Sequence, residues 1–265
     1  MIVVTGATGN VGRPLVEALK AAGEQVTAVS RRAADHPGDL SQPETLKPAL
    51  DGADAVFLMT PPDFLANGDL GAVLDVVRGA GVQRVVLLSS QGVGTQRHPS
   101  YLEDAVTASG LEWTILRPGN FASNAFQWAE SVRTRRVVEA PYGDVLLPAV
   151  DPADIAEVAA AALRGADHGG QIYTLTGPEP IGPRGMAAAI GETIGVPVEF
   201  VELTREEALN RMLGYMPEPV VEATLGAIGS PTADEQAVSP DISQVLGRPA
   251  RTFADWARRN AAAFA

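Results

Sequence analysis

The first thirteen residues, MIVVTGATGNVGR, constrain the fold of this chain more than any other stretch. A short apolar run opens the chain and a glycine-rich turn follows it. Val11, Leu15, Leu19 and Ala22 then recur at helical spacing. This pattern predicts a strand, a tight turn and a helix, which is the context that a dinucleotide-binding fingerprint requires.

Each glycine of this turn has its own physical reason to be glycine. Gly6 removes a Cβ where the backbone bends, Gly9 gives a diphosphate close access to amide N–H groups, and Gly12 lets the helix pack on the strand. The N–H groups and the positive dipole at the start of the helix then attract the anion. The expected contacts are Thr5, Gly6, Thr8, Gly9, Asn10, Val11 and Gly12.

The glycine spacing is G-x-x-G-x-x-G rather than G-x-G-x-x-G, so the alternative interpretation is an ordinary loop. The position of the triplet between a predicted strand and a predicted helix favours a nucleotide site.

Composition narrows the possible partners. The chain has 265 residues, of which 46% are hydrophobic, so one domain, or a domain with a lobe, is expected. A net charge of -12 does not favour direct binding to nucleic acid or to an anionic membrane. The absence of cysteine excludes disulfides, thiolate catalysis and cysteine-ligated zinc. Apolar runs are too short to span a bilayer and no basic signal region is seen, so a cytoplasmic protein is expected.

The second predicted strand, residues 25–30, ends in Ser30-Arg31-Arg32. NAD sites usually place an acidic residue here for the ribose hydroxyls, whereas an arginine can pair with the additional phosphate of NADP. The sequence therefore favours NADP(H), with two solvated surface arginines as the alternative.

Two further segments add candidate cofactor contacts. Asp39 can accept a hydrogen bond from an adenine amino group or can cap its own loop, and Leu40 follows it. Thr60 and Pro61 come at the carboxyl end of the predicted strand 54–60, where open α/β sheets bind ligands.

Strand and helix signals alternate over the first two thirds of the chain. Strands are predicted at 54–60, 84–89 and 111–116, and helices at 43–50, 67–80, 99–109, 121–135 and 151–163. The alternation predicts an α/β fold with a doubly wound parallel sheet. Asp151 and Asp154 flank the start of the last helix and are interpreted as structural, because as metal ligands they would lack partners.

Beyond about residue 165 the pattern changes to a smaller α/β lobe. Strands are expected at 171–175 and 198–201, and helices at 184–194, 204–213, 218–228 and 252–263. Thr204 and Glu207 form a predicted capping box. We therefore predict a nucleotide-binding domain over 1–165 and a substrate-side lobe over 166–265 that covers the cofactor cleft, interleaved with the first rather than independent.

Four stretches carry a family resemblance: residues 5–12, 109–121, 151–158 and 173–178. They resemble the atypical short-chain dehydrogenases/reductases, and within them the NmrA-like and type 2 NADPH:quinone reductase branch. The resemblance implies a Rossmann-type domain that binds NADP(H).

On matching positions, the resemblance implies roles for individual residues. Gly6, Gly9, Asn10 and Val11 would hold the diphosphate, and Arg31 the 2′-phosphate. The residues implied for the nicotinamide side are Thr60, Ser89, Gly119 and Phe121, and Asn120 is a further candidate cofactor contact.

The chain departs from the wider superfamily in its proton machinery. That superfamily uses Tyr-x-x-x-Lys, but Tyr101, Tyr142, Tyr173 and Tyr215 are each followed four residues later by a residue other than lysine. Many NmrA-like relatives carry a lysine four residues before the acid that matches Glu103, and this chain has Pro99 there. A ketone needs a proton donor beside its oxygen, whereas a quinone-like acceptor yields a stabilised anion that solvent can protonate.

Ser90 and His98 remain as candidate catalytic acids, with a structural hydroxyl and a surface histidine as the alternatives. An aromatic substrate would be bordered by Asn120, Phe121, Asn124 and Trp128, and covered by Met212, Tyr215 and Met216. Aromatic and methionine side chains at helical spacing are otherwise core residues.

Three functions follow from these residues. The first is an NADPH-dependent reductase of a quinone-like or conjugated aromatic molecule. The second is a non-catalytic NADP(H) sensor of NmrA type that acts through a protein partner, and the third is a sugar-nucleotide epimerase or dehydratase, which the missing Tyr-x-x-x-Lys disfavours. No metal is expected, and a homodimer is compatible with the sequence.

Overall fold

The computed structural model describes residues 1–32 and 34–265, apart from the side chains of residues 66 and 67. The chain forms two compact units that interleave in sequence. Unit 1 comprises Met1–Gly119, Pro152–Leu175 and Pro240–Pro249. Unit 2 comprises Asn120–Asp151, Thr176–Ser239 and Ala250–Ala265.

A parallel sheet of order β3-β2-β1-β4-β5-β6-β8 forms the centre of unit 1. Ile2 pairs with Val26 on one side and with Ala55 on the other, so the strand order reverses around β1. The predicted doubly wound α/β fold is confirmed. The strands are β1 (Ile2–Thr5), β2 (Val26–Ser30), β3 (His36–Pro37), β4 (Ala55–Met59), β5 (Arg84–Leu88), β6 (Glu112–Pro118) and β8 (Gln171–Leu175).

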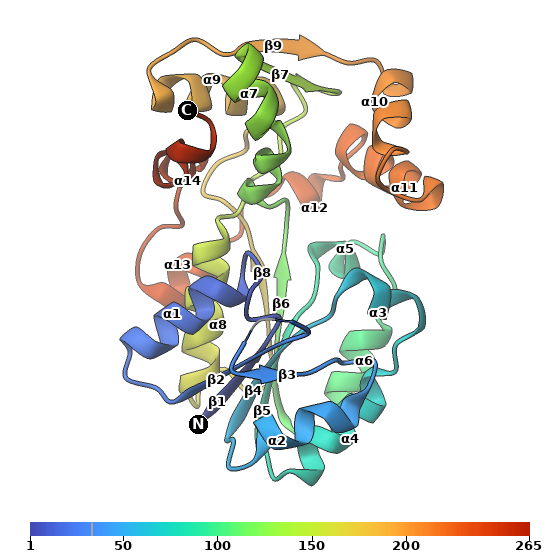
Figure 1. Cartoon of the computed structure of the whole chain (residues 1–265), viewed down its shortest axis with the longest axis vertical. Helices are drawn as coiled ribbons and strands as arrows, with labels where there is room; N and C mark the ends of the chain where they lie inside the picture. Colours follow the sequence, from blue (N-terminus) through green and yellow to red (C-terminus); the bar gives the residue numbers. More distant parts are fainter. Residues whose placement is uncertain (33) are drawn as a thin grey trace. The chain divides into compact units, whose positions relative to one another are not determined.

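Helices cover both faces of this sheet. In Figure 1, α1 and α8 lie together on one face, with α13 against α8, and α2, α4 and α6 lie on the other. The helices of unit 1 are α1 (Gly12–Ala21), α2 (Lys47–Leu50) with the 3-10 turn η1 (Pro43–Leu46), α3 (Pro62–Asn67), α4 (Leu70–Gly79), α5 (Gln91–Gly94), α6 (Tyr101–Ala108), α8 (Pro152–Arg164) and α13 (Asp241–Leu246).

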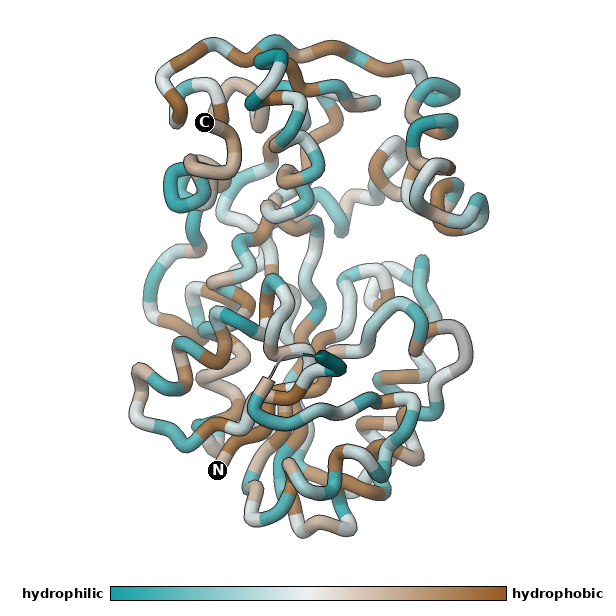
Figure 2. The backbone as a smooth tube through the Cα atoms, in the orientation of Figure 1, coloured by the Kyte–Doolittle hydropathy of each residue, from teal (hydrophilic) through white to brown (hydrophobic). Residues whose placement is uncertain are grey.

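The sheet is buried because its strands are apolar on both faces. Val56, Phe57 and Leu58 of β4 and Val85, Val86 and Leu87 of β5 are almost inaccessible. Figure 2 shows the hydrophobic residues gathered along these central strands. Burial on both faces requires continuous apolar runs rather than alternation, which is why the sequence pattern located these strands.

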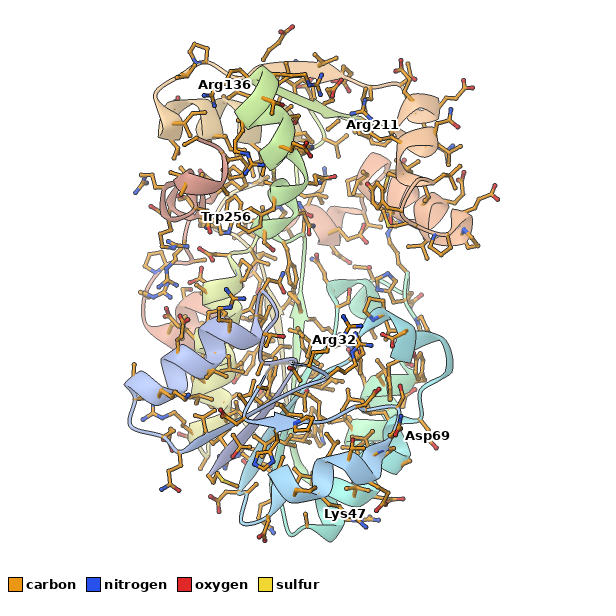
Figure 3. All side chains as sticks on the ribbon, viewed as in Figure 1. Arg32, Lys47, Asp69, Arg136, Arg211 and Trp256 are labelled. Atoms are coloured by element: carbon orange, nitrogen blue, oxygen red, sulfur yellow. The ribbon has the colours of Figure 1, made fainter. Side chains whose placement is uncertain are left out.

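Unit 2 is built around a two-stranded parallel sheet, β7 with β9. Its main core joins Trp128, Phe253, Trp256 and Phe264, and Trp256 is labelled in Figure 3. Its elements are η2 (Ala122–Trp128), α7 (Ala129–Arg135), β7 (Val137–Ala140), α9 (Pro183–Ile194), β9 (Glu199–Glu202), α10 (Arg205–Met212), α11 (Glu218–Gly229), α12 (Ala233–Gln236), α14 (Phe253–Arg259) and η3 (Ala261–Ala263).

Helices α10 and α11 pack around a smaller apolar cluster of their own. Ala208, Val221 and Leu225 are buried there, with Met212 and Met216 against them. The predicted capping box at Thr204 and Glu207 is confirmed at the start of α10. Few buried side chains hold this helix pair, so its packing is the most adjustable in unit 2.

The structure differs from the predicted pattern at several places. The predicted helix 67–80 corresponds to α4, which begins at Leu70 because the Asp69 carboxylate accepts a hydrogen bond from the Ala72 N–H and caps the helix, and α3, which precedes it, was not predicted. The short elements α5, β7, α12 and α13 were not predicted. The units also differ in extent from a division at residue 165, since 120–151 belongs to unit 2 and 171–175 to unit 1.

No helix within the described residues combines the length and the hydropathy needed to cross a bilayer.

Candidate functional site

The turn after β1 has the backbone that its glycines predict. Gly6 has φ +62°, and a Cβ there would lie 2.1 Å from Met59 Cε. A Cβ on Gly12 would lie 2.1 Å from the Gly6 carbonyl oxygen and 2.9 Å from Ala7 Cα, so α1 starts in direct contact with the turn. The Gly9 N–H donates to the Gly6 carbonyl oxygen at 2.9 Å and closes the turn.

A cavity of about 520 Å³ opens beside this turn, within unit 1. It lies where β1, β2 and β4 end, the edge at which doubly wound sheets bind ligands. The predicted cofactor residues that line it are Thr5, Gly6, Thr8, Gly9, Ser30, Arg31, Arg32, Asp39, Leu40 and Pro61.

Val29, Gly38, Leu46 and Met59 also line this cavity but were not predicted. Of these residues, Met59 could have been predicted, because it precedes Thr60 at the end of a buried strand. Its methyl group lies against both Gly6 and Gly9 and forms the floor of the turn.

Val11 and Gly12, also predicted as contacts, are not among the described residues that line this cavity. Val11 is completely buried and Gly12 is the first residue of α1. The Thr5 hydroxyl donates to the Phe57 carbonyl at 2.9 Å and accepts from the Met59 N–H at 3.0 Å, which ties β1 to β4. Asn10 and Thr60 are not among the residues that line the cavity in the described part of the chain.

Charged side chains border the cavity beyond β2. Arg31 Nη1 donates to Asp63 Oδ2 at 2.8 Å, and Arg32, labelled in Figure 3, is the next residue. Asp39 Oδ1 accepts from the Ser41 N–H at 2.9 Å, so Asp39 caps its own loop while it also lines the cavity.

The residues of this cavity fit the phosphates of a dinucleotide. A Cβ on Gly9 would come within 3.1 Å of Met59 Cε and 3.2 Å of the Gly6 carbonyl, so glycine keeps the turn open. The N-terminal, positive end of the dipole of α1, a ten-residue helix, follows directly on this turn and favours an anion there. Arginine side chains at the end of β2 suit an additional phosphate.

Ser89 belongs to a buried cluster at the carboxyl edge of β5 and β6. Its hydroxyl donates to Glu103 Oε1 at 2.5 Å, and Arg117 donates to both oxygens of the same carboxylate, at 3.0 and 2.6 Å. Glu103 is only 5% exposed, and its hydrogen bonds raise the pKa of Arg117. The Gly119 N–H donates to the Leu175 carbonyl at 2.9 Å and so joins β6 to β8.

The structure brings the two predicted catalytic candidates together. His98 Nδ1 lies 3.2 Å from Ser90 Oγ, and the imidazole covers Gly92, where a Cβ would be 2.6 Å from Nδ1. Ser90 also accepts from the Gly92 N–H at 3.1 Å and begins α5. A hydroxyl and an imidazole in this arrangement can exchange a proton.

Unit 2 contains a cavity of about 450 Å³. Asn120 and Phe121, predicted as cofactor contacts, line this cavity and not the cavity of unit 1. The predicted substrate-wall residues line it too: Asn124, Trp128, Met212, Tyr215 and Met216. Asn124 Nδ2 donates to Asn120 Oδ1 at 3.0 Å, which leaves amide groups on a mainly apolar wall.

The charges on this wall neutralise each other. Glu139 and Arg211, which Figure 3 labels on α10, are the charged residues that line the cavity within the described chain. Glu139 Oε2 accepts from Arg135 at 2.5 Å and from Arg211 at 3.2 Å. These hydrogen bonds hold the pKa of Glu139 below its ordinary value.

Tyr101, Tyr173 and Lys47 make structural contacts. The Tyr101 hydroxyl donates to the Leu65 carbonyl at 2.9 Å, and the Tyr173 hydroxyl lies 2.8 Å from His168 Nδ1. Lys47 pairs with Glu44 on the surface. Neither Lys20 nor Lys47 lines the cavity of unit 1 or that of unit 2, as far as the residues are described. Asp154, predicted to be structural, is buried and accepts from Arg248 at 2.7 Å.

Comparisons with known proteins agree with this geometry. Residues 6–166 match the model of the NAD(P)H-binding family. A (4-alkanoyl-5-oxo-2,5-dihydrofuran-3-yl)methyl phosphate reductase of Streptomyces griseus is 37% identical, over 100% of this chain and 99% of its own length. An NAD(P)H azoreductase of Xenophilus azovorans is 34% identical, over 100% and 99%.

A solved structure shows the same fold. The NADPH-dependent quinone oxidoreductase of Escherichia coli, complexed with NADPH, superposes with a TM-score of 0.82 at 22% identity, over 98% of this chain and 99% of that one. The resemblance inferred from the sequence is therefore confirmed. The chain belongs to the NAD(P)H-binding family.

Proposed function

We propose that this chain is an NADPH-dependent oxidoreductase that reduces a quinone-like or other conjugated aromatic acceptor. The proposal rests on the presence of two features in one chain. Unit 1 has a glycine turn bordered by arginines, and unit 2 has a mainly apolar cavity on which one acidic and one basic side chain form an ion pair. The names of the relatives, which include an azoreductase and a quinone oxidoreductase, support the same reaction class.

In this proposal unit 1 binds and orients the cofactor. Bound NADPH supplies a hydride, and the protein contributes position rather than chemistry. The turn from Gly6 to Gly9 and the start of α1 hold the diphosphate, and Arg31 holds the 2′-phosphate by charge-assisted hydrogen bonds.

The cavity of unit 2 selects the acceptor. Its methionine and aromatic side chains favour an apolar, flat molecule, because thioethers adapt to irregular shapes and pack on aromatic rings. The ion pair of Glu139 with Arg211 leaves no net charge on the wall, which favours a neutral acceptor. Asn120 and Asn124 supply amide groups for an acceptor carbonyl.

In this proposal Ser90 and His98 are the proton donors, although neither residue lines the cavity of unit 1 or that of unit 2 in the described chain. A reduced quinone is a stabilised anion, so its protonation by solvent competes with protonation by a side chain. The 3.2 Å contact between His98 Nδ1 and Ser90 Oγ allows the imidazole to replenish the hydroxyl proton. The pair therefore assists the reaction without being indispensable to it.

The loss of NADPH absorbance with a panel of acceptors tests the function. The panel contains menadione, 1,4-naphthoquinone, a neutral azo dye and, as a control, a simple aliphatic ketone. We expect oxidation of NADPH with the quinones or the azo dye and none with the ketone. Tight NADPH binding without oxidation by any conjugated acceptor would contradict the proposal and favour the NADP(H)-sensing alternative.

A further inference from the structure

An ion pair at the rim of the unit 1 cavity involves the arginine assigned to the 2′-phosphate. Arg31 Nη1 lies 2.8 Å from Asp63 Oδ2, with the two side chains 53% and 59% exposed. Arg31 follows β2, whereas Asp63 lies in the first turn of α3, just after β4. The two residues are 32 positions apart in the sequence, so only the fold brings them together.

The topology of the sheet locates this pair. Strand β1 pairs with β2 on one side and with β4 on the other, and the glycine turn leaves the end of β1. A contact between residues that follow β2 and β4 therefore crosses the end of β1. Ser30 and Arg31 line one side of the cavity and Pro61 the other, so the ion pair joins the two rims.

We infer that Asp63 competes with the 2′-phosphate for Arg31, and so reduces the preference of the chain for NADPH over NADH. The inference rests on the proposed function, in which Arg31 holds that phosphate. The Arg31 guanidinium has to break its hydrogen bond to Asp63 before it can form bidentate hydrogen bonds to a phosphate. NADH has no 2′-phosphate and leaves the ion pair in place.

The expected change in nucleotide affinity is small because the Arg31 and Asp63 side chains are exposed to solvent. Both side chains are more than half exposed, so water and salt screen their attraction. An exposed ion pair of this kind changes an equilibrium constant by about two- to fivefold. Asp63 thus adjusts the cofactor preference, while Arg31 determines it.

Calorimetric titration with NADPH and with NADH, in the absence of any acceptor, tests the inference. The proteins are the native chain, Asp63→Asn, Arg31→Ala and the double variant. Asp75→Asn is the matched control, since Asp75 forms an exposed ion pair with Arg78 on α4, also in unit 1 but away from this cavity. Thermal unfolding of each variant establishes that it is folded.

We expect Asp63→Asn to tighten NADPH binding about two- to fivefold, with NADH binding unchanged. Neither Asp75→Asn nor Asp63→Asn in the Arg31→Ala background should alter the affinity for NADPH. No tightening in Asp63→Asn would overturn the inference, as would an equal tightening when Arg31 is absent, because Asp63 would then act directly on the phosphate.

Failure of the inference is distinguishable from failure of the proposed function. A native chain that binds NADPH and loses affinity in Arg31→Ala, but is indifferent to Asp63→Asn, refutes the inference alone. A native chain that binds no NADPH refutes the inference and the assigned cofactor together. The test does not depend on turnover, so the identity of the acceptor has no influence on its outcome.

Discussion

The cavity of unit 1 is shaped by backbone, whereas the cavity of unit 2 is shaped by side chains. In unit 1, the backbone of the turn leaves no room for a Cβ at Gly12, and Gly6 has a positive φ that favours glycine. In unit 2, the wall consists of large side chains such as Trp128, Met212 and Tyr215.

Because of this difference, we expect the two cavities to respond differently to substitution. Backbone that is in contact with backbone cannot yield, so a single added methyl group displaces the turn. Methionine side chains on a lightly packed helix pair can repack around ligands of different shape. We therefore expect the cofactor cavity to be intolerant and selective, and the acceptor cavity to be tolerant and broad.

Substitution of the turn glycines should give the largest effects. Gly12→Ala places a Cβ against the Gly6 carbonyl, so we expect no detectable NADPH binding and a fall of about 1–3 kcal/mol in the free energy of unfolding. Gly9→Ala meets milder contacts and should fold, with NADPH binding weakened on the order of tenfold. Gly79→Ala, which meets no atom within 4 Å, is the control. Calorimetry and urea unfolding measure both quantities, and unaltered NADPH binding in Gly12→Ala would contradict the role of the turn.

Removal of the Arg31 side chain should have the next largest effect. Hydrogen bonds to a charged group are worth about 1.5–3 kcal/mol, so Arg31→Ala should weaken NADPH about ten- to a hundredfold. NADH binding should change little, since it lacks the phosphate. Dissociation constants of both nucleotides check this, and equal weakening of the two would refute the assignment of Arg31.

A change in the unit 2 wall should affect the acceptor and not the cofactor. Met212→Ala removes apolar surface from the cavity, so the KM for a quinone should rise about three- to tenfold while the Kd for NADPH stays the same. Leu213→Ala is the matched control, because Leu213 is the next residue, is exposed and does not line the cavity in the described chain. Similar KM values in the two variants would mean that the acceptor binds elsewhere.

Substitution of the proton-donating pair should have a smaller effect. Ser90→Ala and His98→Gln should each lower kcat for a quinone by less than about tenfold, well below the usual loss for a general acid, because solvent also protonates the product. Steady-state kinetics with a quinone measure kcat for the native chain and for both variants. A kcat that is unaltered in both variants would exclude the pair from proton delivery.

The smallest predicted effect concerns the pH dependence of stability. Two arginines hold the pKa of Glu139 below its ordinary value of 4.5, so its charged form stabilises the fold above that pH and loses this contribution as pH falls through the lowered pKa. Glu139→Gln should lower the free energy of unfolding by about 1 kcal/mol or less near neutral pH. In acid, the gap between the free energies of unfolding of the variant and of the native chain should close. Urea unfolding across this pH range measures the gap, and a gap that is independent of pH would contradict the charge-based explanation.

The parts of the fold that could be predicted are those with local causes. Burial on both faces makes β4 and β5 continuous apolar runs, and the turn glycines act within seven residues of each other. Helix α5 could not be predicted, because it has four residues and two of them are glycine. Strand β7 exists through pairing with β9, where Val137 opposes Glu199, and no local pattern encodes that partner.

The same division holds for the candidate sites. The positions that line the cavity of unit 1 follow from motif and strand ends, as at Gly9 and Arg31. The position of Asn120 and Phe121 on the unit 2 wall could not be predicted in this way, because a chain that leaves β6 can continue into either unit. Contacts such as that of Arg31 with Asp63 arise only when the fold places β2 and β4 on either side of β1.

Titration of the native chain with NADPH in a calorimeter tests the central claim most directly, namely that the glycine turn and Arg31 form a nucleotide site. The account predicts saturable binding of one NADPH per chain, tighter than that of NADH. The absence of saturable binding, or a preference for NADH, would contradict it.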